Sequence, residues 1–159
     1  MSSWSPDGRQ IVYQSVEDGN HDLWIMSAAG NERKQLTDCE GYDGLPDWSP
    51  DGQWVAFVAD NWVWRVAPAG GEPERLSGRE GILPQWDPNG KTLYFVGELW
   101  RNEYWGLSLE DRTERLVADL SGKPGRPGGM AFATDGEYLY FTWEETLGDI
   151  WVMDVVWDE

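Results

Sequence analysis

One pentapeptide recurs along the chain and constrains its fold more than any other feature. Trp-Ser-Pro-Asp-Gly occupies residues 4–8 and 48–52, and weaker copies occupy residues 86–90 (Trp-Asp-Pro-Asn-Gly) and 132–136 (Phe-Ala-Thr-Asp-Gly). Repeats of roughly 40–45 residues are typical of propellers, in which each repeat is one four-stranded blade. The spacing of the copies therefore predicts four related units rather than one ordinary domain.

Each copy predicts a tight turn that leads into a buried strand. Pro presets φ, Asp or Asn tolerates the next turn position, and Gly permits a positive φ. Ile, Val or Leu lies seven residues after each motif aromatic, and Tyr or Phe lies nine residues after it. The residues between these two are also mostly apolar, so the strands are predicted to be buried on both faces, as stacked blades require.

Further apolar segments complete each unit. Third strands are predicted at 23–26, 63–66, 104–107 and 150–153, and fourth strands at 35–37, 75–77 and 115–117. Twelve residues separate Trp24 from Leu36, and the same spacing from Trp151 passes the last residue, Glu159. The sequence therefore predicts an all-β propeller of four four-stranded blades whose last blade lacks its outer strand. The blades are placed at about 1–38, 45–78, 83–119 and 129–159 of one domain, 1–159.

These patterns resemble the WD40-like PD40 repeats of TolB-type β-propellers, which also occur in propeller domains of the dipeptidyl peptidase and prolyl oligopeptidase group. The resemblance is carried by the motif at 4–8 and 48–52, by the apolar runs 11–13 and 55–57, and by the segment 18–26. It implies a PD40 propeller over essentially the whole chain. It implies no particular function, because such rings serve unrelated tasks.

Rings of this family usually have six or more blades, whereas the chain has four copies. The two ends of a four-blade arc would expose apolar faces, predicted from Trp4 and Tyr13 at one end and from Phe141 and Trp151 at the other. A homodimer that forms an eight-bladed ring would cover both, since two head-to-tail junctions close a two-fold ring. A compact four-bladed monomer and a fragment of a longer propeller are the alternatives.

The charge of the chain limits its partners. Asp and Glu number 29 against 12 Lys and Arg, so the formal net charge is −17. Nucleic acid is excluded as a partner because phosphate binding needs clustered cations, and a basic protein or peptide is favoured instead. No apolar run approaches the ~20 residues of a membrane helix, so no membrane partner is expected. With no signal peptide apparent, the chain is predicted to be cytoplasmic, or periplasmic or extracellular if it comes from a secreted precursor.

The loops predict where a ligand or partner binds. Turns on one face of the predicted ring are short and repetitive, whereas the loops on the opposite face vary and are acidic, and variable loops on a rigid ring are the usual binding surface. The segment 121–129 is predicted to be a flexible connector near that face. The residues proposed to contact a ligand or partner are Asp18, His21, Asp22, Trp100, Arg101, Glu144 and Glu145.

Catalysis and metal binding find little support in the sequence. The chain has one histidine and one cysteine, Cys39, whose thiolate is disfavoured by the neighbouring Asp38 and Glu40. The oxygens of residues 18–22 could ligate Ca²⁺ weakly, but the segment lacks the full EF-hand pattern and is better interpreted as a polar turn. No metal, cofactor or catalytic residue is therefore predicted.

The sequence thus favours a non-catalytic scaffold that binds a protein or peptide and closes its ring by self-association. The alternative is the propeller of a serine peptidase of the prolyl oligopeptidase type, where it would gate substrate access. The Gly-x-Ser-x-Gly elbow of the accompanying hydrolase domain does not occur in the chain.

Overall fold

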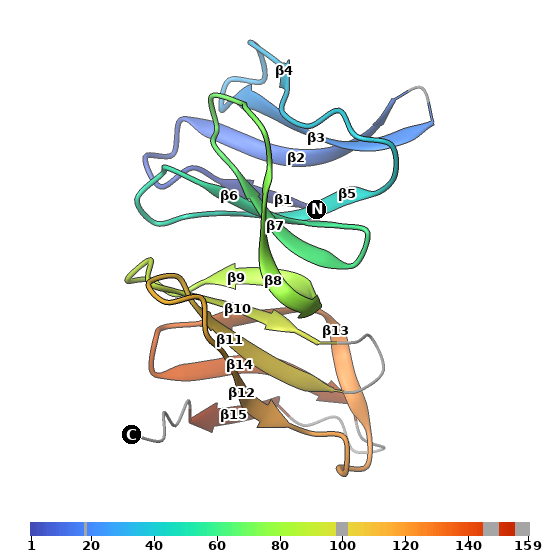
Figure 1. Ribbon diagram of the computed structural model, residues 1–159, viewed down its shortest axis with the longest axis vertical. Coiled ribbons are helices and arrows are strands. Elements are labelled where there is room, and N and C mark those ends of the chain that lie inside the picture. Colours follow the sequence, from blue (N-terminus) through green and yellow to red (C-terminus); the bar gives the residue numbers. More distant parts are fainter. Residues whose placement is uncertain (18, 98–101, 145–149, 155–159) are drawn as a thin grey trace.

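The computed structural model describes residues 1–17, 19–97, 102–144 and 150–154, with side chains except at 128–130 and 150–154. All regular secondary structure in these ranges is β-strand, in four antiparallel sheets stacked in chain order (Figure 1). Each sheet is one propeller blade, which confirms the all-β fold predicted from the repeat. Over the same ranges, no helix has the length and apolar character needed to cross a membrane.

The first two blades each have four strands in the order of the chain. Blade 1 comprises β1 (Ser2–Trp4), β2 (Gln10–Glu17), β3 (Asn20–Ser27) and β4 (Lys34–Gln35). Blade 2 comprises β5 (Asp43–Trp48), β6 (Val55–Ala59), β7 (Trp62–Val66) and β8 (Glu74–Glu80). β3, β7 and β8 contain the segments predicted for them, whereas β4 ends at Gln35 and contains only the first residue of the predicted segment 35–37.

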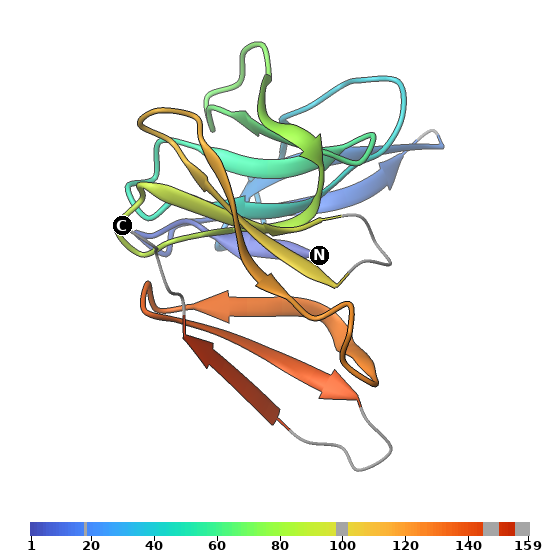
Figure 2. The ribbon, with the colours of Figure 1, turned by 60° about the horizontal axis from the view of Figure 1, so that its bottom comes forward.

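The last two blades differ in their number of strands. Blade 3 comprises β9 (Ile82–Trp86), β10 (Thr92–Val96), β11 (Glu103–Ser108) and β12 (Glu114–Asp119). Blade 4 comprises β13 (Arg126–Thr134), β14 (Tyr138–Glu144) and β15 (Ile150–Asp154). Over the described residues blade 4 thus has three strands, as predicted, and β15 forms its edge at one end of the stack (Figure 2).

The segment 121–129 is only partly the connector that was predicted. Its residues from Arg126 onward belong to β13, where Arg126 pairs with Glu144 of β14. The Arg126 guanidinium also binds the Glu144 carboxylate, with Nη2 to Oε2 at 3.0 Å. A backbone ladder and an ion pair therefore extend the hairpin into a segment whose Gly and Pro content suggested a loop.

The motif turns hold together through their own side chains. In blade 1 the Gly8 amide donates to the Ser5 carbonyl at 2.9 Å, and Gly8 has a φ of 69°. The Ser5 hydroxyl donates to the Asp7 carboxylate and accepts from the Gln10 amide, and the Arg9 amide donates to Asp7. Ser49 and Asp51 repeat this network in blade 2. The motif therefore encodes a self-contained turn between the first and second strands.

Each blade packs its two faces against different neighbours. We call the side toward the previous blade the preceding face and the opposite side the following face. Val12, Leu23 and Ile25 on the following face of blade 1 meet Trp48 and Phe57 on the preceding face of blade 2. The same positions meet at the next two junctions. Between blades 2 and 3 the residues include Ala56, Val63, Trp86, Leu93 and Phe95, and between blades 3 and 4 they include Tyr94, Tyr104, Phe132, Leu139 and Phe141.

The two ends of the stack leave one face of each terminal blade open. At the blade 1 end, the preceding face carries Trp4, which is 58% exposed, together with the half-buried Tyr13. At the blade 4 end, Phe141 was predicted to be exposed, and this is wrong, since it is 6% exposed. Phe141 stacks on Tyr104 of blade 3, with ring centroids 5.1 Å apart, and Tyr140 is the exposed ring instead. The side chain of Trp151 lies outside the described residues.

Candidate functional site

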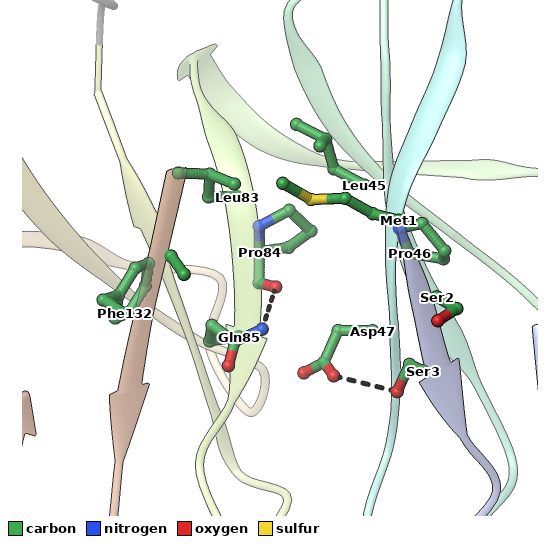
Figure 3. A pocket seen from close by; sticks show the side chains of 11 residues that line it. Met1, Ser2, Ser3, Leu45, Pro46, Asp47, Leu83, Pro84, Gln85 and Phe132 are labelled. Atoms are coloured by element: carbon green, nitrogen blue, oxygen red, sulfur yellow. Dashed lines mark hydrogen bonds between the residues drawn. The ribbon is translucent and has the colours of Figure 1, made fainter. Parts of the chain in front are cut away.

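The first strands of the blades lie side by side, β1 beside β5, β5 beside β9 and β9 beside β13. Together they form one wall, which we call the channel wall because first strands surround the axis of a propeller. A pocket of about 370 Å³ opens on this wall. It is lined by Met1, Ser2, Ser3, Leu45, Pro46, Asp47, Leu83, Pro84, Gln85, Ala131 and Phe132 (Figure 3).

The pocket is built from equivalent positions of successive repeats. Leu45 lies three residues before the motif residue Trp48, and Leu83 lies three residues before Trp86. Each leucine is followed by a proline. Both leucines have a φ of 55°, a left-handed conformation that costs a residue with a Cβ about 1–2 kcal/mol. The ladder shifts register beside each of them. Asp60 and Arg112 also have a positive φ, but they lie in turns between strands, whereas the two leucines lie inside β5 and β9. Backbone strain of this kind is concentrated at functional sites.

A hydrogen-bond relay crosses the channel wall from blade 1 to blade 3. The Trp48 amide donates to the Ser3 hydroxyl at 3.1 Å, and that hydroxyl donates to Asp47 Oδ1 at 3.2 Å. The Trp86 amide donates to Asp47 Oδ2 at 2.8 Å, and the Trp86 indole Nε1 donates to the Asp47 carbonyl at 3.1 Å. The residue before the motif tryptophan of blades 1 and 2 thus accepts from the amide of the motif tryptophan in the next blade, which links blade 1 to blade 2 and blade 2 to blade 3.

Asp47 is the charged group of the pocket. Its half-buried carboxylate lies between Ser3 and Gln85, toward the space that the pocket occupies (Figure 3). Burial raises the pKa of Asp47 to about 6, because it outweighs the hydrogen bonds that favour the ionised form. A carboxylate that ionises near neutrality and faces a cavity is typical of a binding or proton-handling group.

The predicted site residues on blade 1 have structural partners. The Gln14 amide lies 2.8 Å from His21 Nδ1, and the His21 ring lies 5.3 Å from that of Tyr42. Asp22 is 4% exposed and accepts from Asn20 and Gln35. Burial and the charge of Asp38 raise the pKa of Asp22. Asp22 is therefore buried between β3 and β4 of blade 1.

The other predicted site residues lie on other blades or outside the described residues. Glu144 is exposed in blade 4 but is held by Arg126, so it is no free acidic contact. It lies in blade 4, whereas His21 and Asp22 lie in blade 1. Asp18, Trp100, Arg101 and Glu145 lie outside the described residues.

In the described ranges, metal binding would depend on clustered ligands, and thiol chemistry would depend on Cys39. Within these ranges, no three His, Cys, Asp or Glu side chains gather as metal ligands. The Cys39 thiol is exposed and free, and partial burial together with the charges of Asp43, Asp22 and Asp38 raises its pKa. A raised pKa disfavours the thiolate, which is the reactive form.

The channel wall was not predicted from the sequence, although the chain carries a signal for it. Leu-Pro precedes two of the motif aromatics, and a polar residue, Ser3, Asp47 or Gln85, stands directly before three of them. These positions lie outside the turn and the apolar run that define the repeat. Their meaning depends on the contacts between blades, which a single repeat does not show.

Comparison with known proteins places these features in context. Residues 2–104 match the family described as the TolB beta propeller domain, PD40. The Tol-Pal system protein TolB of Alcanivorax borkumensis is 47% identical over 57 residues, 35% of this chain and 13% of that protein. The uncharacterized peptidase YuxL of Bacillus subtilis is 31% identical over 145 residues, 87% of this chain and 21% of that protein.

Solved structures include the same kind of propeller. TolB from Acinetobacter baumannii aligns with a TM-score of 0.78 over 97% of this chain and 40% of that chain, at 18% identity. The chain therefore spans less than half the length of each of these relatives. The likeness extends over the whole arc of blades, and at this level of identity it concerns the fold alone.

Proposed function

Since the chain belongs to the family of TolB β-propeller domains, we propose that it is a non-catalytic scaffold that binds a protein or peptide on its channel wall. The channel-wall pocket carries this proposal, because four successive blades contribute to one strained cavity that contains a charged group. The lining residues include no histidine, the commonest general base, and the Ser3 hydroxyl is held between Asp47 and the Trp48 amide. Binding therefore explains the pocket better than catalysis does.

The test of this site is a photo-crosslink. A benzoylphenylalanine in place of Gln85 reports on the pocket, and the same group in place of Glu110, in the turn between β11 and β12, is the matched control. We expect one protein to be captured at position 85 and not at position 110. Equal capture at both positions would contradict binding at the channel wall.

The proposed partner is basic. The formal charge of −17 gives the chain a field that attracts cationic surfaces and speeds their encounter. Raising the salt concentration from about 0.05 M to about 0.5 M shortens the Debye length and should weaken capture at position 85. Capture that is indifferent to salt would argue for an apolar partner instead.

We also propose that two copies close an eight-bladed ring head to tail, through the preceding face of blade 1 and the following face of blade 4. Tyr140 stands in blade 4 where Tyr94 stands in blade 3, and Trp4 stands in blade 1 where Phe132 stands in blade 4. The junction of blades 3 and 4 buries Tyr94 and Phe132, whereas Tyr140 and Trp4 are 39% and 58% exposed. A second copy would repeat an interface that the chain already makes.

Sedimentation equilibrium tests the ring. We expect a mass of twice 18.1 kDa at micromolar concentration. A mass of 18.1 kDa at all concentrations would support the four-bladed monomer, and masses that grow without limit would show head-to-tail growth that fails to close.

A second candidate function is the propeller of a serine peptidase, and the YuxL match favours it because it covers 87% of this chain. A propeller in that role would gate access to a hydrolase domain encoded in the same gene. An α/β-hydrolase sequence in the adjacent coding sequence would support this candidate over the scaffold. The cytoplasmic location and its periplasmic or extracellular alternative remain predictions from the sequence.

A further inference from the structure

We propose that the channel-wall pocket recognises an arginine side chain of the bound peptide, with Asp47 and Gln85 contacting the guanidinium and the leucine and proline side chains contacting its apolar neighbours. This inference rests on the proposed function and names the chemistry of its ligand. The channel wall offers one acidic group, one free amide oxygen and an apolar rim within one cavity of about 370 Å³.

The carboxylate of Asp47 has acceptor capacity left for a ligand. Its donors within the protein are the Ser3 hydroxyl and the backbone amide of Trp86, which belong to the wall itself. A carboxylate offers about four acceptor sites, so acceptor capacity remains for a donor that enters from the pocket. Among the side chains that line the pocket, that of Asp47 is the only ionisable one.

Gln85 supplies the second acceptor. Its side-chain Nε2 donates to the Pro84 carbonyl at 3.0 Å, which turns the amide so that its nitrogen is occupied and its oxygen remains available. The side chain lies across the pocket from Asp47 (Figure 3). A guanidinium is planar and presents several N–H donors in a fixed fork, so it can reach two acceptors at once, which an ammonium does less well.

The rim of the pocket explains why the ligand is a peptide rather than a small cation. Leu45, Leu83 and Pro84 are apolar, and both leucines line the pocket despite the cost of their left-handed backbone. Pockets of roughly 300–1,000 Å³ with few polar groups are typical of sites that enclose a side chain or a small molecule. A free metal ion would keep its water shell and gain nothing from this surface.

Matched peptides test the inference. Fluorescein-labelled Leu-Arg-Leu amide and its citrulline analogue have the same shape and differ by one charge, and fluorescence polarisation measures the affinity of the full chain for each. We expect the wild-type chain to favour arginine over citrulline by at least tenfold at pH 7.5. This preference should fall toward one as the pH falls below about 6, where Asp47 takes up a proton.

Variants assign the preference to the pocket. Asp47→Asn should abolish it, whereas Asp60→Asn, which removes one charge from the exposed turn between β6 and β7, should retain it. Gln85→Glu adds a carboxylate to the pocket and should increase the preference at least threefold. It also keeps the inference testable if Asp47→Asn fails to fold.

Three results separate the inference from the proposed function. Equal affinity of the wild-type chain for both peptides, with binding abolished by Gln85→Trp, overturns the arginine contact and leaves the channel wall as a binding surface. An arginine preference unchanged in Asp47→Asn and Gln85→Glu also overturns it. Failure of both peptides to bind, together with no crosslink at position 85, overturns both proposals.

Discussion

The central blades and the terminal blades contain the same repeat in different surroundings. In blades 2 and 3 the second strands are buried along nearly their whole length, from Val55 to Val58 and from Leu93 to Val96. In blade 4 the second strand alternates between buried and exposed residues, and in blade 1 only Val12 of β2 is fully buried. The repeat determines where a strand forms, whereas the neighbouring blade determines how much of it is buried.

The largest difference in the stability cost of a mutation is expected between equivalent core positions of a central and a terminal blade. Leu93 in blade 3 is fully buried, and Ile11, at the same position of blade 1, is only half-buried. Leu93→Ala should lower the free energy of unfolding by about 3 kcal/mol, since a core cavity adds to the loss of burial. Ile11→Ala should lower it by about 1 kcal/mol when the chain is monomeric.

Urea denaturation at low protein concentration measures both values. At concentrations where chains associate, the cost of Ile11→Ala should rise toward that of Leu93→Ala, because a second copy would cover the position. Equal costs at every concentration would show that the end of the arc is closed within a single chain.

A smaller effect on stability is expected from the Asp47 carboxyl, because burial raises its pKa. Asp47 has a pKa raised to about 6, above that of an unfolded aspartate near 3.8, so between these values the folded chain holds the extra proton. Stability therefore falls as pH rises from about 4 to 6. Asp47→Asn should remove about 1–2 kcal/mol of this dependence, a value reduced for the partial exposure of the group.

The turn aspartate Asp51 provides the control with opposite sign. The Ser49 hydroxyl and the Gln53 amide lower the pKa of Asp51, although burial opposes them. Its contribution to stability is present above about pH 4 and is lost as pH falls through the folded pKa. Thermal unfolding from about pH 2 to pH 7 should show that Asp47→Asn changes the pH dependence of stability between about pH 4 and 6, whereas Asp51→Asn changes it only below about pH 4 and in the opposite direction. A parallel response would contradict the assignment of the Asp47 pKa to burial.

The smallest effect should be equal in both kinds of blade. Ser5 in blade 1 and Ser49 in blade 2 make the same contacts inside their turns. Each serine-to-alanine change should cost about 1 kcal/mol, the usual value of such hydrogen bonds. Urea titrations that give costs differing by more than about 1 kcal/mol would show that the turn depends on its neighbours after all.

Much of the fold follows from the sequence because the repeat is local. Proline, aspartate and glycine specify the turn within five residues, and the apolar run after it specifies a strand. The start of β13 was missed because Arg126 is stabilised by Glu144, eighteen residues away, in a segment rich in glycine and proline. Phe141 was assigned to the open end because both faces of its strand carry aromatic residues, and only the contact with Tyr104 decides between them.

The candidate site was harder to predict than the fold. Acidic loop residues attracted attention, but Asp22 is buried by its partners and Glu144 is paired, so neither charge is available. Asp47 stands before a motif tryptophan, and its role arises from Ser3 of one blade and Trp86 of another. Contacts between repeats produce the pocket, and these cannot be seen within one repeat.

The central claim is that the two open faces of the arc meet each other in a second copy. Trp4→Glu and Tyr140→Glu each place a charge on one of these faces, at exposed positions where the fold should tolerate it. Circular dichroism and thermal unfolding verify that both variants remain folded. Each variant alone should then sediment as a monomer of 18.1 kDa.

Sedimentation equilibrium of the equimolar mixture is the most direct test. In a mixed pair, the intact Tyr140 face of one chain meets the intact Trp4 face of the other, so one of two head-to-tail junctions survives. We predict a species of twice 18.1 kDa in the mixture, with weaker association than in the wild-type chain. A mixture that stays monomeric while the wild-type chain dimerises, or a wild-type chain that never dimerises, would contradict the claim.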